Sequence, residues 1–487
     1  MSILKRVASY LPAMPAAEYS IPEQAASLIN YLVDSWWLKI DERNRGMDSI
    51  PADPMTVIKE EWLGCSINDF VLLSQKFPPY AKDQYAWAFL QLFVGEDAPY
   101  EIVPIVEQSQ YGSYVKKQFQ IVKSQIFVDY GIQTTVPIEG TFFVIHKSTG
   151  DHLIIGFGMC SYDSYNVNIN VTVSKGQEVL AENFFKDLQA SLIKNDIYFK
   201  KCLSFNQGIL GFHGIKKTLW EDLILKPEII DSIRVNSIGI IDHIQDLQSL
   251  GMCPNRNTLL ISPPGMGKTT LFRAISAEIL GKSTAIWVTG KSITYSGHVT
   301  ALFEAARSLA PCVVFIEDID LFAKDRSGLG LSEGGVFNEF LSCLDGAQAN
   351  TGVIVMASTN DLDSLDEAFT ARPGRFHNKV IVPLPDKEDR MKMLHSFFGD
   401  FNAAPDQTVT KDIISSLIDM MEGMTGDYIK DFVQTVIIRS VNAGQSSNNG
   451  TVFSADDLMK SMDQVLQNYR IGKSAKKHFH HEVKEAV

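Results

Sequence analysis

The stretch LLISPPGMGKTTLF, residues 259–272, constrains this chain more than any other part of its sequence. An apolar run stops at two prolines, passes two glycines and a lysine, and continues with the spacing of a helix. A turn that closes a buried strand and opens a helix directs backbone N–H groups, and the positive end of the helix dipole, at one point. Such a point attracts anions, so the stretch predicts a site for a phosphate-bearing ligand.

The residue types in this turn suit a nucleoside triphosphate. Gly265 and Gly267 let the backbone approach the phosphates, Lys268 can reach the β and γ oxygens, and the next hydroxyl can ligate Mg²⁺. The pattern is G-x-x-x-x-G-K-[ST], except that Ser262 stands at the first glycine position. Serine adopts many backbone angles, so we expect the loop to survive this change. The predicted nucleotide-binding residues of the turn are Pro264, Gly265, Met266, Gly267, Lys268, Thr269 and Thr270.

A second apolar run, CVVFIEDID, ends in carboxylates, as a strand beside a phosphate-binding turn should. Phosphoryl transfer needs one carboxylate near Mg²⁺ and another to orient the attacking water. By position, Glu317 is the metal-side group, together with the Thr269 hydroxyl, and Asp318 is the water-side group. The usual order is Asp then Glu, and the shorter Asp318 predicts slow hydrolysis. The alternative is an inactive, nucleotide-bound switch.

The motifs from about residue 218 to 467, taken in order, resemble those of AAA ATPases, a clade of the AAA+ class. GVIVMASTN resembles the sensor-1 strand, which implies that Asn360 lies near the γ-phosphate and takes part in catalysis. LDEAFTARPGRFHNKVIVPLPD resembles the second region of homology, which implies that Arg372 and Arg375 are arginine fingers acting on a neighbouring subunit's ATP. This resemblance implies ATP hydrolysis with Mg²⁺ in a head-to-tail homo-oligomeric ring, most often a hexamer.

Two further segments resemble the parts of these ATPases that hold adenosine. GMTGDYIKDFV resembles the start of the sensor-2 helix, which implies that Gly426 and Asp427 approach the adenosine. LWEDLILKPEIIDSI resembles the segment before the phosphate turn, which implies that Asp222 and Leu223 line the adenine pocket. The Glu-Asp order in CVVFIEDID also resembles the subgroup around the mitochondrial respiratory-complex-III assembly ATPase. Those proteins carry a membrane anchor and this sequence shows none, so their function is not carried over.

The wider pattern predicts an α/β P-loop AAA+ core with a C-terminal helical lid, preceded by an α+β N-terminal domain. Short, uniformly apolar runs alternate with helical ones in the core, which is typical of a parallel sheet covered on both faces. NVNINVTVS alternates strictly and predicts a half-buried strand. The expected divisions are a mostly helical region at 1–100, an α+β partner-recognition domain at 101–205, a linker at 206–217, the nucleotide-binding domain at 218–386, the lid at 387–470 and a polar tail at 471–487.

Composition narrows the partners and the compartment. The net charge of −13, without a basic run, speaks against nucleic acid as a partner. The six cysteines are scattered without a Cys-x-x-Cys pair, which favours reduced thiols in a cytoplasmic protein. The N-terminal stretch lacks the apolar run of a secretory signal, and no stretch reaches the roughly 18 apolar residues of a membrane span.

Three functions remain open at this point. The first is a chaperone-like machine that remodels or disassembles a protein substrate or complex; the second is a slow, ATP-gated assembly scaffold; the third, disfavoured by charge, is a nucleic-acid loader. The family threads substrate past an aromatic–aliphatic–glycine pore loop. Here Tyr295-Ser296-Gly297 stands in a shorter loop, and Tyr295 is equally well read as a core residue. The Gly/Ser stretch at 323–335 is either a second pore loop or a surface loop.

Overall fold

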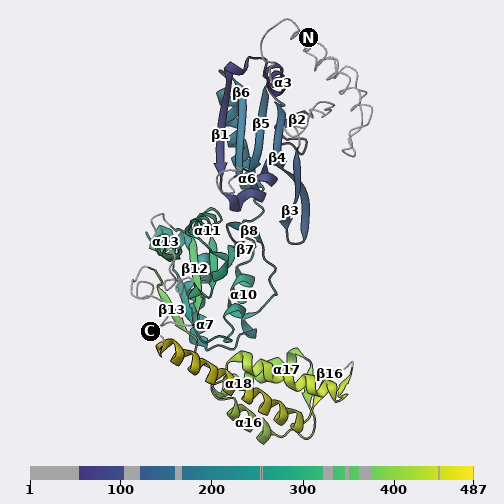
Figure 1. Cartoon of the computed structure of the whole chain (residues 1–487), viewed down its shortest axis with the longest axis vertical. Helices are drawn as coiled ribbons and strands as arrows, with labels where there is room; N and C mark the ends of the chain where they lie inside the picture. The colour runs from purple at the N-terminus through teal and green to yellow at the C-terminus, as the bar shows by residue number, and fades with distance from the viewer. Residues whose placement is uncertain are drawn as a thin grey trace. The chain divides into compact units, whose positions relative to one another are not determined.

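The computed structural model (Figure 1) describes residues 54–103, 121–159, 167–252, 254, 256–321, 333–345, 350–360, 375–447 and 450–485. The chain forms two compact units, of which unit 1 is drawn from residues 1–77, 85–125 and 135–195. Unit 2 is drawn from residues 78–84, 126–134 and 196–487. The helix expected in AASLINYLVDSWWLKI lies outside the described residues.

Unit 1 is built on an antiparallel sheet in the order β1-β6-β5-β4-β2, with β3 paired to β4. Its strands are β1 (Phe70–Phe77), β2 (Tyr100–Val103), β3 (Val122–Asp129), β4 (Ile132–His146), β5 (His152–Met159) and β6 (Val167–Ser174). The helices in this part of the chain are α3 (Pro54–Leu63), α4 (Lys82–Gln91) and α6 (Glu178–Lys194). Strand β6 alternates between buried and half-exposed residues, as its sequence predicts for a sheet with one face on a core.

The division expected at residue 100 is not observed. Strand β1 lies in the region predicted to be mostly helical, and it pairs with β6 from Phe70 opposite Ser174 to Phe77 opposite Val167. Residues on both sides of position 100 therefore belong to one sheet. The segment FVLLSQKF has no regular alternation of its own, so a partner strand far along the chain decides its conformation.

Unit 2 contains a second sheet in the order β13-β9-β12-β11-β10-β7-β8. Its strands are β7 (Cys202–Asn206), β8 (Ile209–Phe212), β9 (Thr258–Ile261), β10 (Thr284–Thr289), β11 (Cys312–Glu317), β12 (Val353–Thr359) and β13 (Asn378–Ile381). Its helices include α7 (Pro227–Asn236), α8 (Ile238–Asp242), α9 (Ile244–Ser249), α10 (Lys268–Ile279), α11 (Ser296–Ser308) and α13 (Glu333–Asp345). The pairs from β13 to β7 are parallel. Figure 1 shows α10 on one side of the sheet and α11 with α13 on the other, which is the predicted α/β core.

The segment expected to be a linker, 206–217, is partly built into this sheet. Strand β7 pairs in parallel with β10, with Cys202 opposite Ala285, and β8 returns antiparallel to β7. Gln207 and Gly208 join the two strands with φ angles of 49° and 83°. A two-residue turn with both φ angles positive is the turn that matches the twist of a hairpin. The glycine that suggested a flexible connector is therefore a turn residue.

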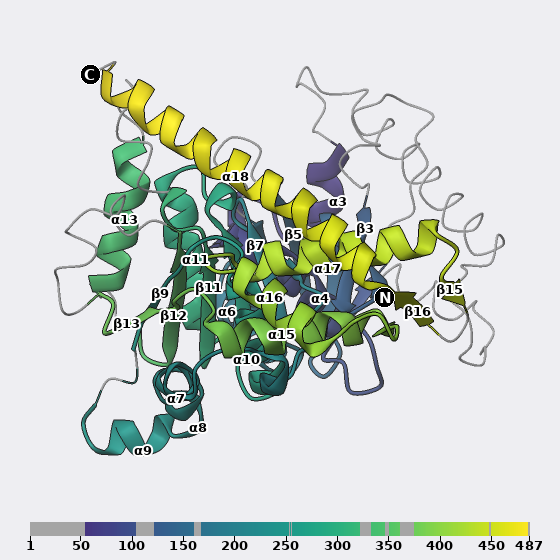
Figure 2. The same ribbon diagram turned by 90° about the horizontal axis from the view of Figure 1, so that it is seen from below.

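The lid consists of four helices and a small sheet. They are α15 (Lys387–Asp400), α16 (Lys411–Met420), α17 (Gly426–Asn442), α18 (Ala455–Glu485), β14 (Ala403–Pro405), β15 (Ser446–Ser447) and β16 (Gly450–Phe453). Figure 2 shows α18 as one long helix alongside α17. The expectation of helices alone misses the three short strands, which lie in the order β14-β16-β15. The helix α18 also continues through residues 471–485, where a polar tail is expected.

Cysteine burial and helix character test two further expectations. The described cysteines form no disulfide, and Cys202 and Cys312 are buried. Burial raises the pKa of the Cys202 thiol to about 12. Among the described helices, none combines the length and apolar character needed to cross a bilayer.

The buried His298 on α11 makes stability depend on pH. The Thr294 backbone N–H donates to its Nδ1 atom at 3.3 Å, and burial lowers its pKa. The unfolded chain takes up a proton near pH 6.5 that the folded chain resists, so stability falls below that pH. We expect the melting temperature to fall between about pH 7.5 and about pH 5.5. His298→Gln should show a shallower fall, and an unchanged slope would contradict this assignment.

Candidate nucleotide-binding site

The phosphate turn joins β9 to α10 with the backbone that its glycines predict. Gly265 and Gly267 have φ angles of 81° and 82°, a backbone conformation that residues with a Cβ atom rarely adopt. Helix α10 begins at Lys268, directly after Gly267. Ser262, at the position of the usual first glycine, is buried and accepts hydrogen bonds from Lys268 Nζ through both its carbonyl and its hydroxyl, each at 3.1 Å. The substitution therefore adds a contact to the turn and leaves its backbone intact.

The lysine lies at the centre of the polar cluster. Lys268 Nζ also donates to the Pro263 carbonyl at 3.2 Å and to Asn360 Oδ1 at 2.7 Å. Burial lowers the pKa of Lys268, and the surrounding carboxylates act in the opposite direction by favouring the ammonium. These carboxylates belong to Asp318, Asp320, Glu317 and Asp427. The ammonium thus lies where anionic phosphate oxygens would gain a strong, charge-assisted hydrogen bond.

The metal-side residues contact each other directly. Thr269 is in the first turn of α10 and Glu317 is the last residue of β11, and Thr269 Oγ1 donates to Glu317 Oε1 at 2.6 Å. A hydroxyl and a carboxylate on adjoining elements form the oxygen donor set that Mg²⁺ prefers. The residues present therefore fit a magnesium ion bound beside the phosphates.

Asp318, the predicted water-side residue, is held by Asn360, the predicted sensor-1 residue. Asn360 follows β12, and its Nδ2 atom donates to Asp318 Oδ1 at 2.7 Å while its Oδ1 atom accepts from Lys268. Asp318 has a φ angle of 53°, which is rare for a residue other than glycine. The carboxylate and the ammonium are thus joined through one amide side chain.

The sequence predictions overlooked Asp320, the third acid of CVVFIEDID. Asp320 is buried, and its Oδ1 atom accepts from Thr359 Oγ1 at 3.3 Å. A buried carboxylate near Lys268 makes the electrostatic potential at the site more negative. The third acid of CVVFIEDID could have indicated Asp320, but only the fold shows that its side chain is buried.

The lid contacts the phosphate turn through the start of α17. The Asp427 N–H donates to the Gly265 carbonyl at 3.1 Å. A Cβ atom on Gly265 would lie 2.8 Å from Asp427 Oδ2, and one on Gly426 would lie 3.2 Å from the Gly265 carbonyl oxygen. Glycine is therefore needed at position 265, whereas a Cβ atom at position 426 would require the neighbouring atoms to move by a few tenths of an ångström. The contact brings Gly426 and Asp427 to the turn, and their role toward adenosine stays a prediction.

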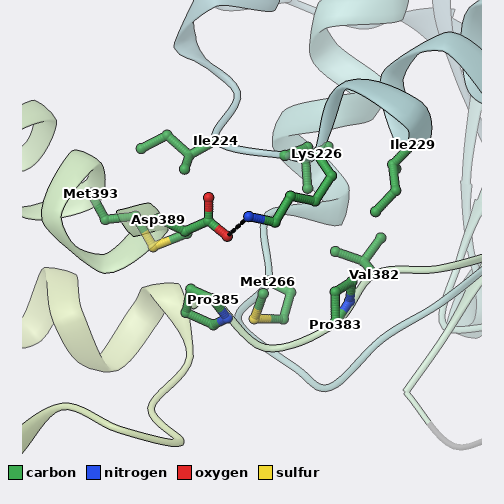
Figure 3. A pocket seen from close by; sticks show the side chains of 10 residues that line it. Ile224, Lys226, Ile229, Met266, Val382, Pro383, Pro385, Asp389 and Met393 are labelled. Atoms are coloured by element: carbon green, nitrogen blue, oxygen red, sulfur yellow. Dashed lines mark ion pairs between the residues drawn. The ribbon is translucent and has the colours of Figure 1, made fainter. Parts of the chain in front are cut away.

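A pocket lies next to the turn, between the core and the lid (Figure 3). Its lining residues are Ile224, Leu225, Lys226, Ile229, Met266, Val382, Pro383, Pro385, Asp389 and Met393. Most of its lining side chains are apolar. Asp222 and Leu223 are not among them: Asp222 accepts from the Leu219 N–H at 2.8 Å, and Leu223 packs on the core. Their role toward adenine stays a prediction.

An ion pair crosses the pocket from the core side to the lid side. Lys226 Nζ lies 3.0 Å from Asp389 Oδ2, as the dashed line in Figure 3 marks, and it also contacts Asp386. The Lys226 ammonium holds the pKa of Asp386 down at about 2. Asp386 and Asp389 also cap the N-terminus of α15. The lysine therefore fixes the first lid helix beside the pocket.

The remaining predicted residues are less closely connected to this cluster. Pro264 is exposed and Thr270 is half-buried in α10. Arg372 lies outside the described residues, whereas Arg375 is buried and forms a double hydrogen bond with Asp345, with Nε–Oδ1 and Nη2–Oδ2 distances of 2.8 and 2.7 Å. Arg375 thus contacts its own subunit's α13, and a role toward a neighbour stays a prediction.

Neutralising Glu317 and neutralising Asp318 should impair different steps of the reaction. Glu317→Gln should weaken the magnesium dependence of ATP binding, because it removes the charge beside Thr269. Asp318→Asn should keep Mg²⁺-ATP binding and slow hydrolysis by roughly a hundredfold or more. Titration with a fluorescent ATP analogue, with and without Mg²⁺, and phosphate release measure the two effects, with Lys268→Ala as the control that loses binding. The reverse pattern would show that the two roles are exchanged.

Comparison with known proteins agrees with this geometry. Residues 258–384 match the model of the "ATPase family associated with various cellular activities (AAA)". The ATP-dependent zinc metalloprotease FtsH of Synechococcus sp. (strain JA-2-3B'a(2-13)) is 32% identical over 253 residues, covering 49% of this chain and 37% of the relative. The Acidothermus cellulolyticus FtsH is 30% identical over 273 residues, covering 54% and 37%.

A third relative, the FtsH of Cupriavidus metallidurans, is 38% identical over 178 residues, which cover 34% of this chain and 27% of the relative. The chain therefore spans well under half the length of these curated relatives. The residues that match the family model include the phosphate turn, the paired acids and Asn360. Residues 258–384 form an AAA ATPase domain, which uses ATP and Mg²⁺.

Proposed function

We propose that this chain hydrolyses ATP as a head-to-tail homo-oligomeric ring and uses the energy to remodel or disassemble a protein substrate or complex. The observation that carries the proposal is the contact network of the site. Thr269 meets Glu317 on one side, and Asn360 joins Lys268 to Asp318 on the other. The groups that we propose bind the phosphates, hold Mg²⁺ and orient the water thus lie within one contact cluster.

Each residue of the cluster has a separate task in the reaction. The turn N–H groups and Lys268 bind the phosphates, and Thr269 with Glu317 would hold Mg²⁺, which neutralises charge on the phosphate oxygens. Asp318 accepts a hydrogen bond from the attacking water and orients it toward the γ-phosphorus. Asn360 orients the Asp318 carboxylate through one Nδ2 hydrogen and can donate its other Nδ2 hydrogen to the γ-phosphate. The water oxygen forms a bond to the γ-phosphorus as the bond from the γ-phosphorus to the bridging oxygen breaks. The proton that the water loses passes to Asp318 and then to solvent, and ADP and phosphate form.

The remodelling part of the proposal is supported by the relatives and by one exposed aromatic residue. The names of the relatives describe ATP-dependent zinc metalloproteases, which are enzymes whose action on proteins depends on ATP. Tyr295, the residue before α11, is 50% exposed, and its ring packs against His298 and over Gly297. This exposure favours the pore-loop interpretation over a core role. Proteolysis is not proposed, because the sequence has no His-Glu-x-x-His pattern.

The slow scaffold remains the second candidate, and the acid order favours it. Asp318 is shorter than the usual Glu and is already bound to Asn360, which limits its reach toward a water. Turnover far below the order of 1 s⁻¹, together with stable rings, would select the scaffold.

Unfolded protein should stimulate the ATPase if the chain is a remodelling machine. The purified chain with Mg²⁺-ATP is measured alone, with a permanently unfolded protein and with single-stranded DNA. We expect severalfold stimulation by the unfolded protein and none by DNA. Tyr295→Ala should lose the stimulation while keeping basal turnover, and equal stimulation in both would count against pore threading.

Mixed rings test whether an arginine acts on a neighbour's ATP. Arg375→Ala and Asp318→Asn should each lose turnover by about a hundredfold or more. When the two variants assemble together, some interfaces join an intact Asp318 site to an intact Arg375, so activity should partly return. The mixture is measured by phosphate release after co-assembly is shown by light scattering.

The ion pair with Asp345 supplies the control. Asp345→Asn breaks the pair and keeps the arginine, so it should retain turnover if Arg375 acts in trans. If Asp345→Asn is as inactive as Arg375→Ala, and the mixture does not recover, Arg375 acts only within its own subunit.

A further inference from the structure

The backbone at Asp318 is held in an unfavourable conformation by its neighbours. Its φ angle of 53° is costly for a residue with a Cβ atom, so the surrounding contacts must impose it. The Asp318 N–H points to Ser358 Oγ at 3.4 Å, and its carbonyl accepts from the Leu321 N–H at 3.0 Å. The direction of the carboxylate depends on these contacts, because a small backbone rotation moves the whole side chain.

Gly290 lies directly against this backbone. It follows β10 and opens a single turn of 3-10 helix, Gly290–Ser292, which we call the spacer turn. The parallel register places Thr289 opposite Glu317, so the next residues, Gly290 and Asp318, leave the sheet side by side. A Cβ atom on Gly290 would lie 2.9 Å from the Asp318 carbonyl oxygen and 2.9 Å from Leu321 Cβ.

Glycine is needed at position 290 because neighbouring atoms lie close to it, and not because of its backbone torsion angles. Gly290 has no positive φ angle, so its own backbone would accept alanine. The obstacle is a backbone atom of the residue that orients the water, and a backbone atom cannot move without changing Asp318. A methyl group at Gly290 would therefore push on the hydrolytic residue itself.

The β7–β8 hairpin supports the spacer turn from its other end. The Gln207 N–H, in the hairpin turn, donates to the Ser292 carbonyl at 3.0 Å. The hydroxyl group of Thr289, the residue before the spacer turn, lies 2.8 Å from the hydroxyl group of Ser292. The turn is thus fixed between the hairpin and the Asp318 backbone, and it cannot yield freely to a clash at Gly290.

We propose that Gly290 and the spacer turn are positioning elements for hydrolysis: they set the direction of the Asp318 carboxylate without touching the nucleotide. This inference rests on the proposed ATP hydrolysis. It makes the β7–β8 hairpin part of the machinery that determines the rate. Nucleotide binding does not depend on the spacer turn, because Lys268, Thr269 and Glu317 make their contacts independently of it.

The test compares Gly290→Ala with Gly214→Ala in the full chain. A Cβ atom on Gly214 would meet nothing within 4 Å, and its φ angle is not positive, so this variant is the matched control. We expect Gly290→Ala to lower kcat by roughly ten- to a hundredfold, because a displacement near 1 Å can cost that much. The affinity for a fluorescent ATP analogue with Mg²⁺ should match that of Gly214→Ala, whereas the melting temperature should be lower because the added methyl group clashes with Asp318 and Leu321.

Ser292→Ala is the second variant, because it loosens the spacer turn without adding atoms. It should lower kcat by about threefold or more and leave ATP affinity unchanged. If Gly290→Ala fails to fold, an unchanged kcat in Ser292→Ala overturns the inference. A folded Gly290→Ala with the kcat of Gly214→Ala also overturns it. If the unmodified chain binds Mg²⁺-ATP and shows no turnover, the proposed function fails together with the inference.

Discussion

The parallel pairing of β9, β12 and β11 is the constraint on which the nucleotide site depends. Ile261 pairs with Thr359, and Ala357 pairs with Ile316, so the carboxyl ends of the three strands reach the same edge of the sheet. The phosphate turn, the acidic pair and the sensor asparagine follow these strands directly. Because the strands are buried on both faces, a shift in register would disrupt their close packing, so the register is strongly fixed. The distances within the site follow from it.

The phosphate turn is also the place where the lid meets the core. Gly265 accepts a hydrogen bond from the Asp427 N–H, and Lys226 pairs with two acids at the start of α15. Both contacts lie beside the apolar pocket, so a ligand in that pocket would touch the core and the lid together. A nucleotide bound in that pocket would therefore link binding to lid position through the same few residues. Such a link would need no long-range pathway, because the contacts are direct.

The sequence predicted which residues meet at the phosphate turn more completely than it predicted their surroundings. Lys268, Thr269, Glu317, Asp318 and Asn360 each stand at the end of a strand, directly after one or at a helix start, where local pattern identifies them. The pocket beside the turn was less predictable, because its lining joins residues of the core, such as Ile224, to residues of the lid. The linker expectation failed because a hairpin turn and a flexible connector both use glycine. Arg375 shows a different case, since its pairing with Asp345 joins two segments that no local pattern relates.

The sequence alone determined the phosphate turn, the order of its acids and the alternation of apolar strands with helices, because these depend on the spacing of neighbouring residues. The tertiary structure decided which distant segments meet. It added β7 and β8 to the edge of the sheet, turned Asp320 inward, and placed Gly290 against the Asp318 carbonyl. Such contacts arise from the packing of strands and turns that lie far apart in the chain, and close packing leaves room there for glycine alone.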